Sequence, residues 1–305
     1  MIQGLRIHFS RLSDAIYVRK RKLDSIRAAS PKLTNVSDSQ NTSYEKTLHA
    51  IANSNRLFRK FRRIKSYKFI VETVTYDQGK LYKERIEELA SLKAGIIEAA
   101  KENDKIGSPL AFRYPHFGKI SPTTLRYLSV ASEIQELFPH LYQPSIAEIG
   151  VGYGGQASIL YDSLAFKKYS MFDLPDALRL SYKFLDNLNK SKNIELEDLS
   201  STRAKKWDLV ISNYAFSELP RSLQITYVER VLSVSECGYL IMNSGRENHS
   251  GRNEGKLTFE ELLMFIPELE ILPEIPNTGK DNYLIIWKNR IQDAPTPKIL
   301  GSIGE

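Results

Sequence analysis

The chain has 305 residues, 42% of them hydrophobic and one of them cysteine, with a formal net charge of +7, a composition ordinary for a globular protein. The single cysteine, Cys237, excludes a disulfide framework and favours a cytoplasmic setting, where we expect it as a packed thiol. No apolar run reaches the ~18 residues of a membrane-spanning helix, and charges scattered through residues 1–22 argue against a signal peptide.

Positive charge is concentrated at the start of the chain. Residues 1–70 contain 16 Lys and Arg against four Asp and Glu, so they carry +12 and the remainder −5. The basic residues gather at 19–22 and 56–68. One interpretation is a solvated helical arm. The other is attraction to an anion, such as a membrane surface, a phosphorylated or lipid-linked substrate, or RNA.

Residues 1–143 are predicted to form a helical N-terminal region. Apolar residues recur at helical spacing in several of its segments. These predicted helices lie at about 1–28, 44–69 and 81–102. A further helix is expected to begin at Pro122, because Ser121 is a typical cap residue and proline suits the first helical position, and to end before Pro139.

From residue 144 to about 290, strand patterns alternate with helix patterns. The predicted strands lie at 145–149, 169–173, 193–198, 207–213, 238–243, 269–273 and 282–288. The predicted helices lie at about 155–166, 175–189, 219–235 and 259–265. This alternation indicates a parallel sheet covered on both faces, and the last two strands can pair as an antiparallel hairpin at its edge. A tail, 291–305, follows.

A glycine-rich turn follows the first of these strands. Gly150, Gly152 and Gly155 allow a ligand to lie against bare backbone at the start of a helix. Asp173 ends the next strand, where its carboxylate is placed to accept hydrogen bonds from the two hydroxyls of a ribose. Together the turn and the acid predict an adenosine-containing cofactor.

The glycine spacing alone also fits the dinucleotide pattern G-x-G-x-x-G. Three features favour S-adenosylmethionine over NAD. Glu148, two residues before the first glycine, can organise the amides of the loop and the amino-acid end of the ligand. Gly154 and Gly155 make a tighter turn than a diphosphate needs. The sheet ends in a hairpin, whereas a dinucleotide fold continues into a second parallel half.

In combination, these segments resemble class I S-adenosylmethionine-dependent methyltransferases, an α/β fold whose Rossmann-like sheet has seven strands, the last of them antiparallel. The segments are AEIGVGYGG (147–155), MFDLP (171–175), WDLVISNYAFSEL (207–219) and GYLIMNS (238–244). With ISPTTLRYL (120–128) and a helical region before the core, the chain is also similar to a sugar O-methyltransferase family. The resemblance covers about 144–290.

The resemblance implies S-adenosyl-L-methionine as the cofactor and a sugar hydroxyl, in a cell-surface glycan or its precursor, as the methyl acceptor. Four residues match the loop that holds the methionine part of the cofactor: Glu148, Gly150, Gly152 and Gly154. The remaining matches lie on later strands: Asp173 at the ribose, Leu174 beside the adenine, Asp198 at the adenine amino group, and Asn213 and Tyr214 facing the transferable methyl.

Some of these residues have ordinary structural alternatives. Asp173 could cap the helix that begins near Pro175. Asp198 precedes two serines and is more typical of a turn residue. Asn213 and Tyr214 could serve packing alone.

Transfer of a methyl group to a hydroxyl benefits from a general base with a pKa near neutrality, which favours histidine. His249 is the first candidate, because its loop follows the fifth strand at the carboxyl edge of the sheet. Arg246 and Arg252 flank it and could bind a phosphate of the acceptor. His116, just before the helix expected to cover the pocket, and Glu218 are the other candidates.

Two other functions stay open. An RNA methyltransferase could use the basic arm to grip phosphates, although Ser212-Asn213-Tyr214-Ala215 differs from the N/D-P-P-Y tetrad typical of base methylation. A non-catalytic partner subunit could retain the fold. A metal is not expected, because no dense cluster of Asp, Glu and His has ligand spacing. For a sugar methyltransferase, the basic arm would keep the protein near the inner face of a membrane.

Overall fold

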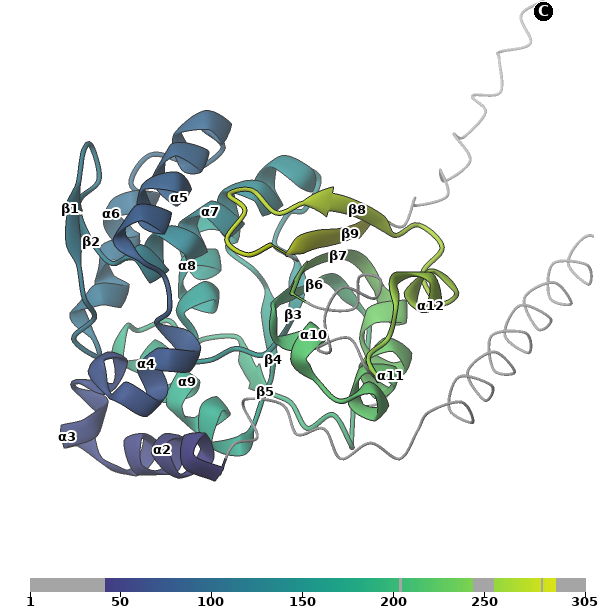
Figure 1. Cartoon of the computed structure of the whole chain (residues 1–305), viewed down its shortest axis with the longest axis horizontal. Coiled ribbons are helices and arrows are strands. Elements are labelled where there is room, and N and C mark those ends of the chain that lie inside the picture. The colour runs from purple at the N-terminus through teal and green to yellow at the C-terminus, as the bar shows by residue number, and fades with distance from the viewer. Residues whose placement is uncertain (1–41, 203–204, 244–254, 281, 289–305) are drawn as a thin grey trace, which may run out of the picture.

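The computed structural model describes residues 42–202, 205–243, 255–280 and 282–288 (Figure 1). The helix expected over 1–28 and the tail 291–305 lie outside these ranges. Among the helices that are described, none combines the length and the apolar character needed to cross a membrane.

The N-terminal region is built from shorter helices than expected. In chain order they are α2 (Thr42–Asn53), α3 (Asn55–Phe58), η2 (Phe61–Arg63), α4 (Lys65–Val71), α5 (Tyr76–Leu89), α6 (Ile96–Ala100) and η3 (Lys101–Lys105). The segment expected as one helix over 44–69 is divided because Ser54 starts a new helix, accepting a hydrogen bond from the Leu57 amide. The helix expected over 81–102 begins earlier, at the Thr75 cap, and is interrupted at Ala90, whose φ is 50°.

A hairpin that the sequence analysis did not predict precedes the next helix. It consists of β1 (Phe112–Tyr114) and β2 (Gly118–Ile120). Helix α7 (Pro122–Leu137) then begins as predicted, with the Ser121 hydroxyl accepting from the Thr124 amide at 3.2 Å. Within 122–134 every residue except Arg126 is buried. Helix α7 is therefore a packed wall of the fold, and its residues Arg126 and Tyr127 line the large cavity described below.

The seven predicted strands form one sheet, in the order β5-β4-β3-β6-β7-β9-β8. They are β3 (Ser145–Ile149), β4 (Lys168–Phe172), β5 (Ile194–Leu196), β6 (Trp207–Asn213), β7 (Ser235–Met242), β8 (Glu270–Pro273) and β9 (Tyr283–Lys288). The first five are parallel, and β9 lies antiparallel between β7 and β8. This order confirms the predicted fold class, a Rossmann-like methyltransferase sheet whose last strand is reversed.

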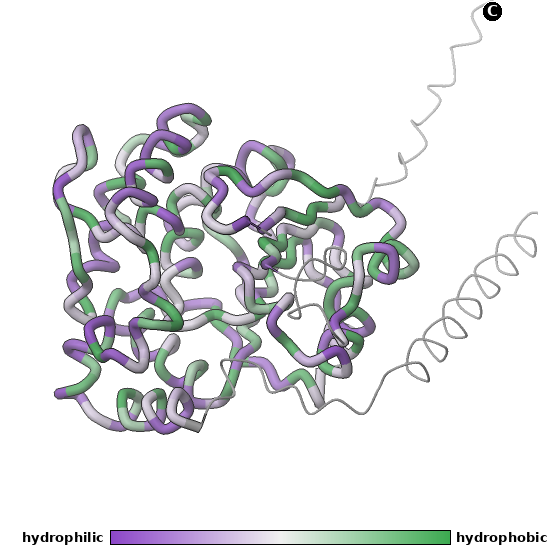
Figure 2. Tube along the Cα trace, in the orientation of Figure 1, coloured by the Kyte–Doolittle hydropathy of each residue, from purple (hydrophilic) through white to green (hydrophobic). Residues whose placement is uncertain are grey.

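Helices cover both faces of the sheet (Figure 1). Helices α7, α8 (Gly155–Leu164) and α9 (Pro175–Asn187) lie on one face; α10 (Ala215–Glu218), α11 (Arg221–Arg230) and α12 (Phe259–Leu263) lie on the other. Side chains of a strand alternate between the faces. In β3, Ile146 joins the core under the first group of helices, and Ala147 and Ile149 join the core under the second. Apolar segments accordingly run along the sheet in Figure 2.

The thiol of Cys237 is one of these packed groups. Its side chain is buried in β7, and burial raises its pKa to about 11. A thiol with this pKa is protonated at neutral pH and is a poor nucleophile. The expectation of a packed thiol is confirmed.

A buried arginine ties the N-terminal region to the start of α7. The Arg62 guanidinium donates to Glu72 at 3.2 Å, to Asp104 at 3.0 Å and to the Ser121 hydroxyl at 3.0 Å. Its side chain is fully buried, and the Glu72 side chain is 7% exposed. Removing one partner of a buried ion pair leaves the other charge without compensation, which is costly.

We therefore predict that Arg62→Met destabilises the protein by about 3–5 kcal/mol in chemical denaturation, because Glu72 and Asp104 lose their counterion. Arg59→Met is the matched control, since Arg59 is exposed three residues away, and it should change the free energy of unfolding by about 0.5 kcal/mol or less. Equal effects of the two substitutions would contradict the structural role of Arg62.

Candidate functional site

The loop between β3 and α8 needs its glycines. Gly150, Gly152 and Gly154 have φ values of 81°, 57° and 85°, in the region that favours glycine. At Gly150 a Cβ atom would also lie 2.0 Å from the Cβ of Ala215, so no side chain fits. The Gly150 amide donates to the carbonyl of Phe172 at 2.8 Å, which holds the loop against the end of β4.

The Asp173 carboxylate organises this loop. It accepts a hydrogen bond from the Gly152 amide at 3.1 Å and another from the Leu174 amide at 2.7 Å. Burial raises the pKa of Asp173 to about 6, although the amides of Leu174, Gly152 and Val151 act in the opposite direction. Asp173 is thus an acceptor that already orders the loop on which a ligand would lie.

Glu148 is a second acid beside the loop. It is 2% exposed and accepts a hydrogen bond from the Tyr169 hydroxyl at 2.7 Å. Burial raises the pKa of Glu148 to about 8, with a smaller contribution from the charge of Asp173 in the same direction, while the Tyr169 bond lowers it. Two acids whose charged forms are disfavoured by burial suit a ligand that carries positive charge.

These residues open into a cavity of about 950 Å³ at the carboxyl ends of the strands. It lies where the strand order reverses between β3 and β6, which is where α/β sheets bind ligands. Ligand pockets usually measure about 300–1,000 Å³, so this one has room for a cofactor and an acceptor together.

The cavity has two sides. The glycine-loop side comes from the ends of β3, β4 and β5 and includes Glu148, Gly150, Gly152, Asp173, Leu174 and 196–199. The hairpin side comes from α5, α7, the end of β6 and the loop between β8 and β9, and includes Tyr82, Arg126, Asn213, Tyr214, Thr278 and Asn282.

Tyr214 holds the hairpin side together. Its φ of 71° is unusual for a residue with a side chain, and its amide donates to the Ile241 carbonyl at 2.8 Å. Its hydroxyl donates to the buried carboxylate of Glu274 and lies 3.2 Å from the Thr278 hydroxyl. Glu274 also accepts from the Thr278 amide at 2.7 Å, so one carboxylate orders both the loop and the tyrosine.

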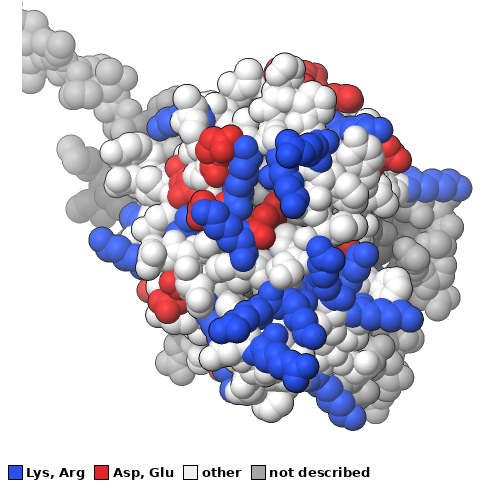
Figure 3. Space-filling model, turned by 90° about the vertical axis from the view of Figure 1, so that its left-hand side faces the viewer, with Lys and Arg blue, Asp and Glu red and all other residues white. Residues whose placement is uncertain are grey.

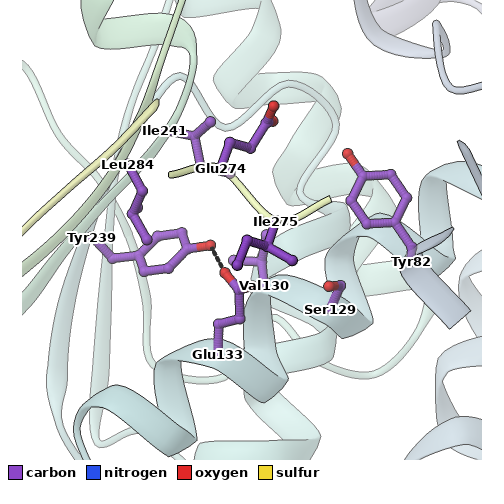
Figure 4. A pocket seen from close by; sticks show the side chains of 9 residues that line it. All are labelled: Tyr82, Ser129, Val130, Glu133, Tyr239, Ile241, Glu274, Ile275 and Leu284. Atoms are coloured by element: carbon purple, nitrogen blue, oxygen red, sulfur yellow. Dashed lines mark hydrogen bonds between the residues drawn. The ribbon is translucent and has the colours of Figure 1, made fainter. Parts of the chain in front are cut away.

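A second, much smaller cavity, which shares Tyr82 with the hairpin side, is drawn in Figure 4. Its volume is about 10 Å³, enough for about one water molecule. In Figure 4 the Tyr239 hydroxyl points at Glu133, to which it donates at 2.5 Å, and the carboxylate of Glu274 points away from this pair. The small cavity is a gap in packing, and the large one is the candidate site.

The structure brings most of the predicted site residues together. The following line the cavity: Glu148, Gly150, Gly152, Asp173, Leu174, Asp198, Asn213, Tyr214 and Glu218. Gly154 does not line it and instead caps α8. Asp198 lines it but is also a turn residue, since its carboxylate accepts from the amide of Ser200 at 2.9 Å and from its hydroxyl at 2.6 Å.

The three candidate bases are placed differently. Glu218 lines the cavity and accepts from the Asn243 side chain at 2.9 Å. His116 lies in the turn of the β1–β2 hairpin, with φ 66°, exposed and outside the cavity lining. His249, Arg246 and Arg252 lie outside the described residues.

Several residues of the cavity wall were not found from sequence. They are Tyr44 of α2, 69–71 at the end of α4, Tyr82 of α5, Arg126 of α7 and Glu197 after β5. Only Arg126 carries a sequence signal, since it is the one basic residue in the helix 122–137. Among the described residues, no group of three or more His, Cys, Asp and Glu side chains is arranged to hold a metal ion.

No family model matches the chain, and no curated protein matches it in sequence. Similar solved structures include a SAM dependent methyltransferase from Aquifex aeolicus, with 16% identity, a TM-score of 0.39 and coverage of 52% of this chain and 89% of that one. An S-adenosylmethionine-dependent methyltransferase from Clostridium acetobutylicum has 13% identity, a TM-score of 0.41 and coverage of 52% and 89%. TehB from Haemophilus influenzae has 11% identity and a TM-score of 0.41, with coverage of 52% of this chain and 62% of that one. At these values the matches add nothing about activity, and the fold class rests on the strand order.

The raised pKa of Glu148 predicts a pH dependence of stability. The folded state favours the protonated form of Glu148. Its contribution to the free energy of unfolding is therefore fully present below about pH 4.5 and is lost as the pH rises through about 8. Glu148→Gln should therefore gain stability relative to the unmodified protein between pH 5 and pH 8.5, by up to a few kcal/mol at about 1.4 kcal/mol per unit.

Thermal unfolding midpoints across this pH range measure the difference. The exposed Glu136→Gln is the control, and its difference from the unmodified protein should stay constant. A constant difference for Glu148→Gln as well would show that Glu148 ionises normally.

Proposed function

We propose that the protein is an S-adenosylmethionine-dependent O-methyltransferase whose acceptor is a sugar hydroxyl of a cell-surface glycan or its precursor. The observation that carries the proposal is a pair of carboxylates, Glu148 buried and Asp173 half-buried, beside a glycine loop at the switch point of a seven-stranded sheet with a reversed last strand. A sulfonium cofactor fits this pair, because its positive charge compensates acids that burial alone disfavours.

Each part of the glycine-loop side has a role in holding the cofactor. Asp173 accepts hydrogen bonds from the ribose hydroxyls, Leu174 packs beside the adenine, and Glu148 with the loop at 150–152 holds the amino-acid end. When bound, the cofactor supplies an activated methyl group, and the protein has to orient the acceptor and take its proton.

The hairpin side suits a polyhydroxylated acceptor. Its wall offers hydrogen-bonding side chains from separate elements: Gln78, Asn213, Tyr214, Asn243, Thr278 and Asn282. The sugar assignment also draws on the similarity of ISPTTLRYL (120–128) to the sugar O-methyltransferase family. Among the described residues, Glu218 is the candidate base that lines the cavity, and we propose that it accepts the hydroxyl proton.

Charge supports a second candidate function, methylation of RNA. Arg56, Arg59, Lys60, Lys65 and Lys68 are exposed and form a basic surface. Figure 3 shows lysine and arginine side chains gathered on the side of the molecule to which α3 and α4 belong. Retention on RNA that weakens steeply with salt would favour this function over the first.

Asp173→Asn tests the cofactor assignment. It should weaken S-adenosylhomocysteine binding by about tenfold or more in calorimetry, because hydrogen bonds to a charged acceptor are lost. Asp176→Asn is the control, since Asp176 lies three residues further on, in the first turn of α9, and pairs with His49 and Arg179 at the surface. Unchanged affinity in the first variant would refute the assignment, and a protein without measurable affinity would favour a non-catalytic role.

The two raised pKa values also predict proton release on binding. Positive charge favours ionised carboxylates, so S-adenosylmethionine should displace protons from Glu148 and Asp173, with affinity rising between about pH 6 and pH 8. S-adenosylhomocysteine lacks the sulfonium and should release fewer protons. Calorimetry at pH 7 in Pipes and in Tris measures the number of protons released, because the two buffers have different heats of ionisation. Equal release for the two ligands would argue against charge compensation at the sulfonium.

Glu218→Gln tests the base. It should lower the methylation rate by about 10²–10⁴-fold and leave S-adenosylhomocysteine affinity unchanged, because the proton acceptor is lost and the cofactor contacts are kept. The readout is mass spectrometry of the host's surface glycan, which should lose one CH2 per repeat without the protein or with the variant. If the glycan is fully methylated with Glu218→Gln but not with His249→Ala, the general base is His249 and not Glu218.

A further inference from the structure

Arg126 is an exception within a buried helix. It lies in the second turn of α7, and its side chain lines the hairpin side of the large cavity. Arginine remains charged at any pH at which proteins fold. Arg126 therefore places a permanent positive charge in the cavity wall.

Among the other buried or half-buried arginines of the described chain, three have acidic partners, and Arg230 donates instead to the backbone carbonyls of Leu199 and Ser200. Arg62 pairs with Glu72 and Asp104, Arg85 with Glu133, and Arg221 with Glu261. Arg126 forms no ion pair with any described residue, and its Nε is buried without a hydrogen-bond partner there. A buried cation without a counterion is unfavourable unless a ligand supplies one.

The surroundings of Arg126 place it with the acceptor. Its guanidinium carbon lies 5.3 Å from the ring centre of Tyr127 and 5.9 Å from that of Tyr214, and Tyr82 is the third aromatic group around it. Tyr82 and Tyr214 belong to the hairpin side, where Tyr214 is hydrogen-bonded to Glu274. The Tyr127 side chain is a hydrogen-bond partner of this guanidinium. Aromatic faces tolerate a guanidinium, and the Nε of Arg126 remains available for an oxyanion.

The mouth of the cavity is also positively charged, like Arg126. Phe69 at the end of α4 lines the cavity and is 70% exposed, so it stands at the mouth. Lys65 of the same helix lies over its ring, with the ammonium 5.9 Å from the ring centre. The basic surface defined above continues along this helix to the mouth, and a field of this sign raises the local concentration of anions.

We propose that Arg126 binds an anionic group of the methyl acceptor, a carboxylate or a phosphate, and so selects an acidic or phosphorylated sugar over a neutral one. The inference rests on the proposed function, because it takes the glycine-loop side to be filled by the cofactor. Arg126 is then a specificity residue, and the methyl transfer itself does not involve it.

Acetate and inorganic phosphate are the smallest probes of such a site. The experiment titrates each into the full-length protein saturated with S-adenosylhomocysteine, at constant ionic strength set with sodium chloride, and follows the thermal unfolding midpoint. At least one probe should raise the midpoint of the unmodified protein. A response to acetate alone assigns a carboxylate acceptor, and a response to phosphate alone assigns a phosphorylated one.

Arg126→Gln should lose this response, with probe affinity falling about tenfold or more, and should keep S-adenosylhomocysteine affinity within about twofold. The variant should fold, since it removes an unpaired buried charge. Arg126→Lys is a second variant, which keeps the charge but loses the fork and should respond only weakly. Arg113→Gln, at an exposed position outside the cavity lining, is the control and should respond fully.

Three results would overturn the proposal: no response in the unmodified protein, an equal response in Arg126→Gln, or a tenfold loss of S-adenosylhomocysteine affinity in that variant. The last result would assign Arg126 to the carboxylate of the cofactor. If the unmodified protein binds no S-adenosylhomocysteine, the proposed function fails separately, and the probe titrations without it still decide whether Arg126 is an anion site.

Discussion

The carboxylate of Asp173 is the contact on which the site depends, because it joins the ends of two adjacent strands. Asp173 directly follows β4, and its carboxylate accepts a hydrogen bond from the amide of Gly152 in the loop after β3. Glu148 lies buried nearby and accepts a hydrogen bond from Tyr169. Burial disfavours negative charge on both acids. Ionised acids in this arrangement cost stability, and the proposed function takes the positive charge of a sulfonium nucleoside to offset that cost, which a dinucleotide would not do.

The N-terminal region completes this site. Helices α4 and α5 and the segment between them supply one wall, through 69–71, 73–74, Gln78 and Tyr82. The buried Arg62 fixes their position through Glu72 at the end of α4. The same network reaches the glycine loop, since Asn103 donates to the Gly155 carbonyl at 3.1 Å. One hydrophobic cluster runs from Tyr44 to the sheet. The hairpin side and the glycine-loop side of the cavity are therefore parts of one packed structure.

The sequence predicted the sheet well because each strand is short, apolar and ended by residues that stop it. Strands β3 and β6 have the predicted bounds, and Gly150 and Asp173 line the cavity as expected. The helices before the sheet were harder to predict. The breaks at Ser54 and Ala90 depend on local caps within continuous helical patterns, and the β1–β2 hairpin is only three residues on each strand.

The cavity wall shows a second limit of sequence reasoning. Tyr82, Arg126 and Thr278 are far apart in the chain and meet only through packing of α5, α7 and the hairpin loop. His116 was favoured for its chemistry, yet the backbone turns it to the surface at the tip of a hairpin. Residue type can nominate a base or an anion site, but the fold decides which residues share a cavity.

A crystal structure with S-adenosylhomocysteine tests the central claim most directly. The account predicts the ribose hydroxyls on the Asp173 carboxylate and the amino-acid end against the backbone at 150–152. Density for the nucleoside elsewhere, or a loop that accepts a diphosphate in preference to it, would contradict the account.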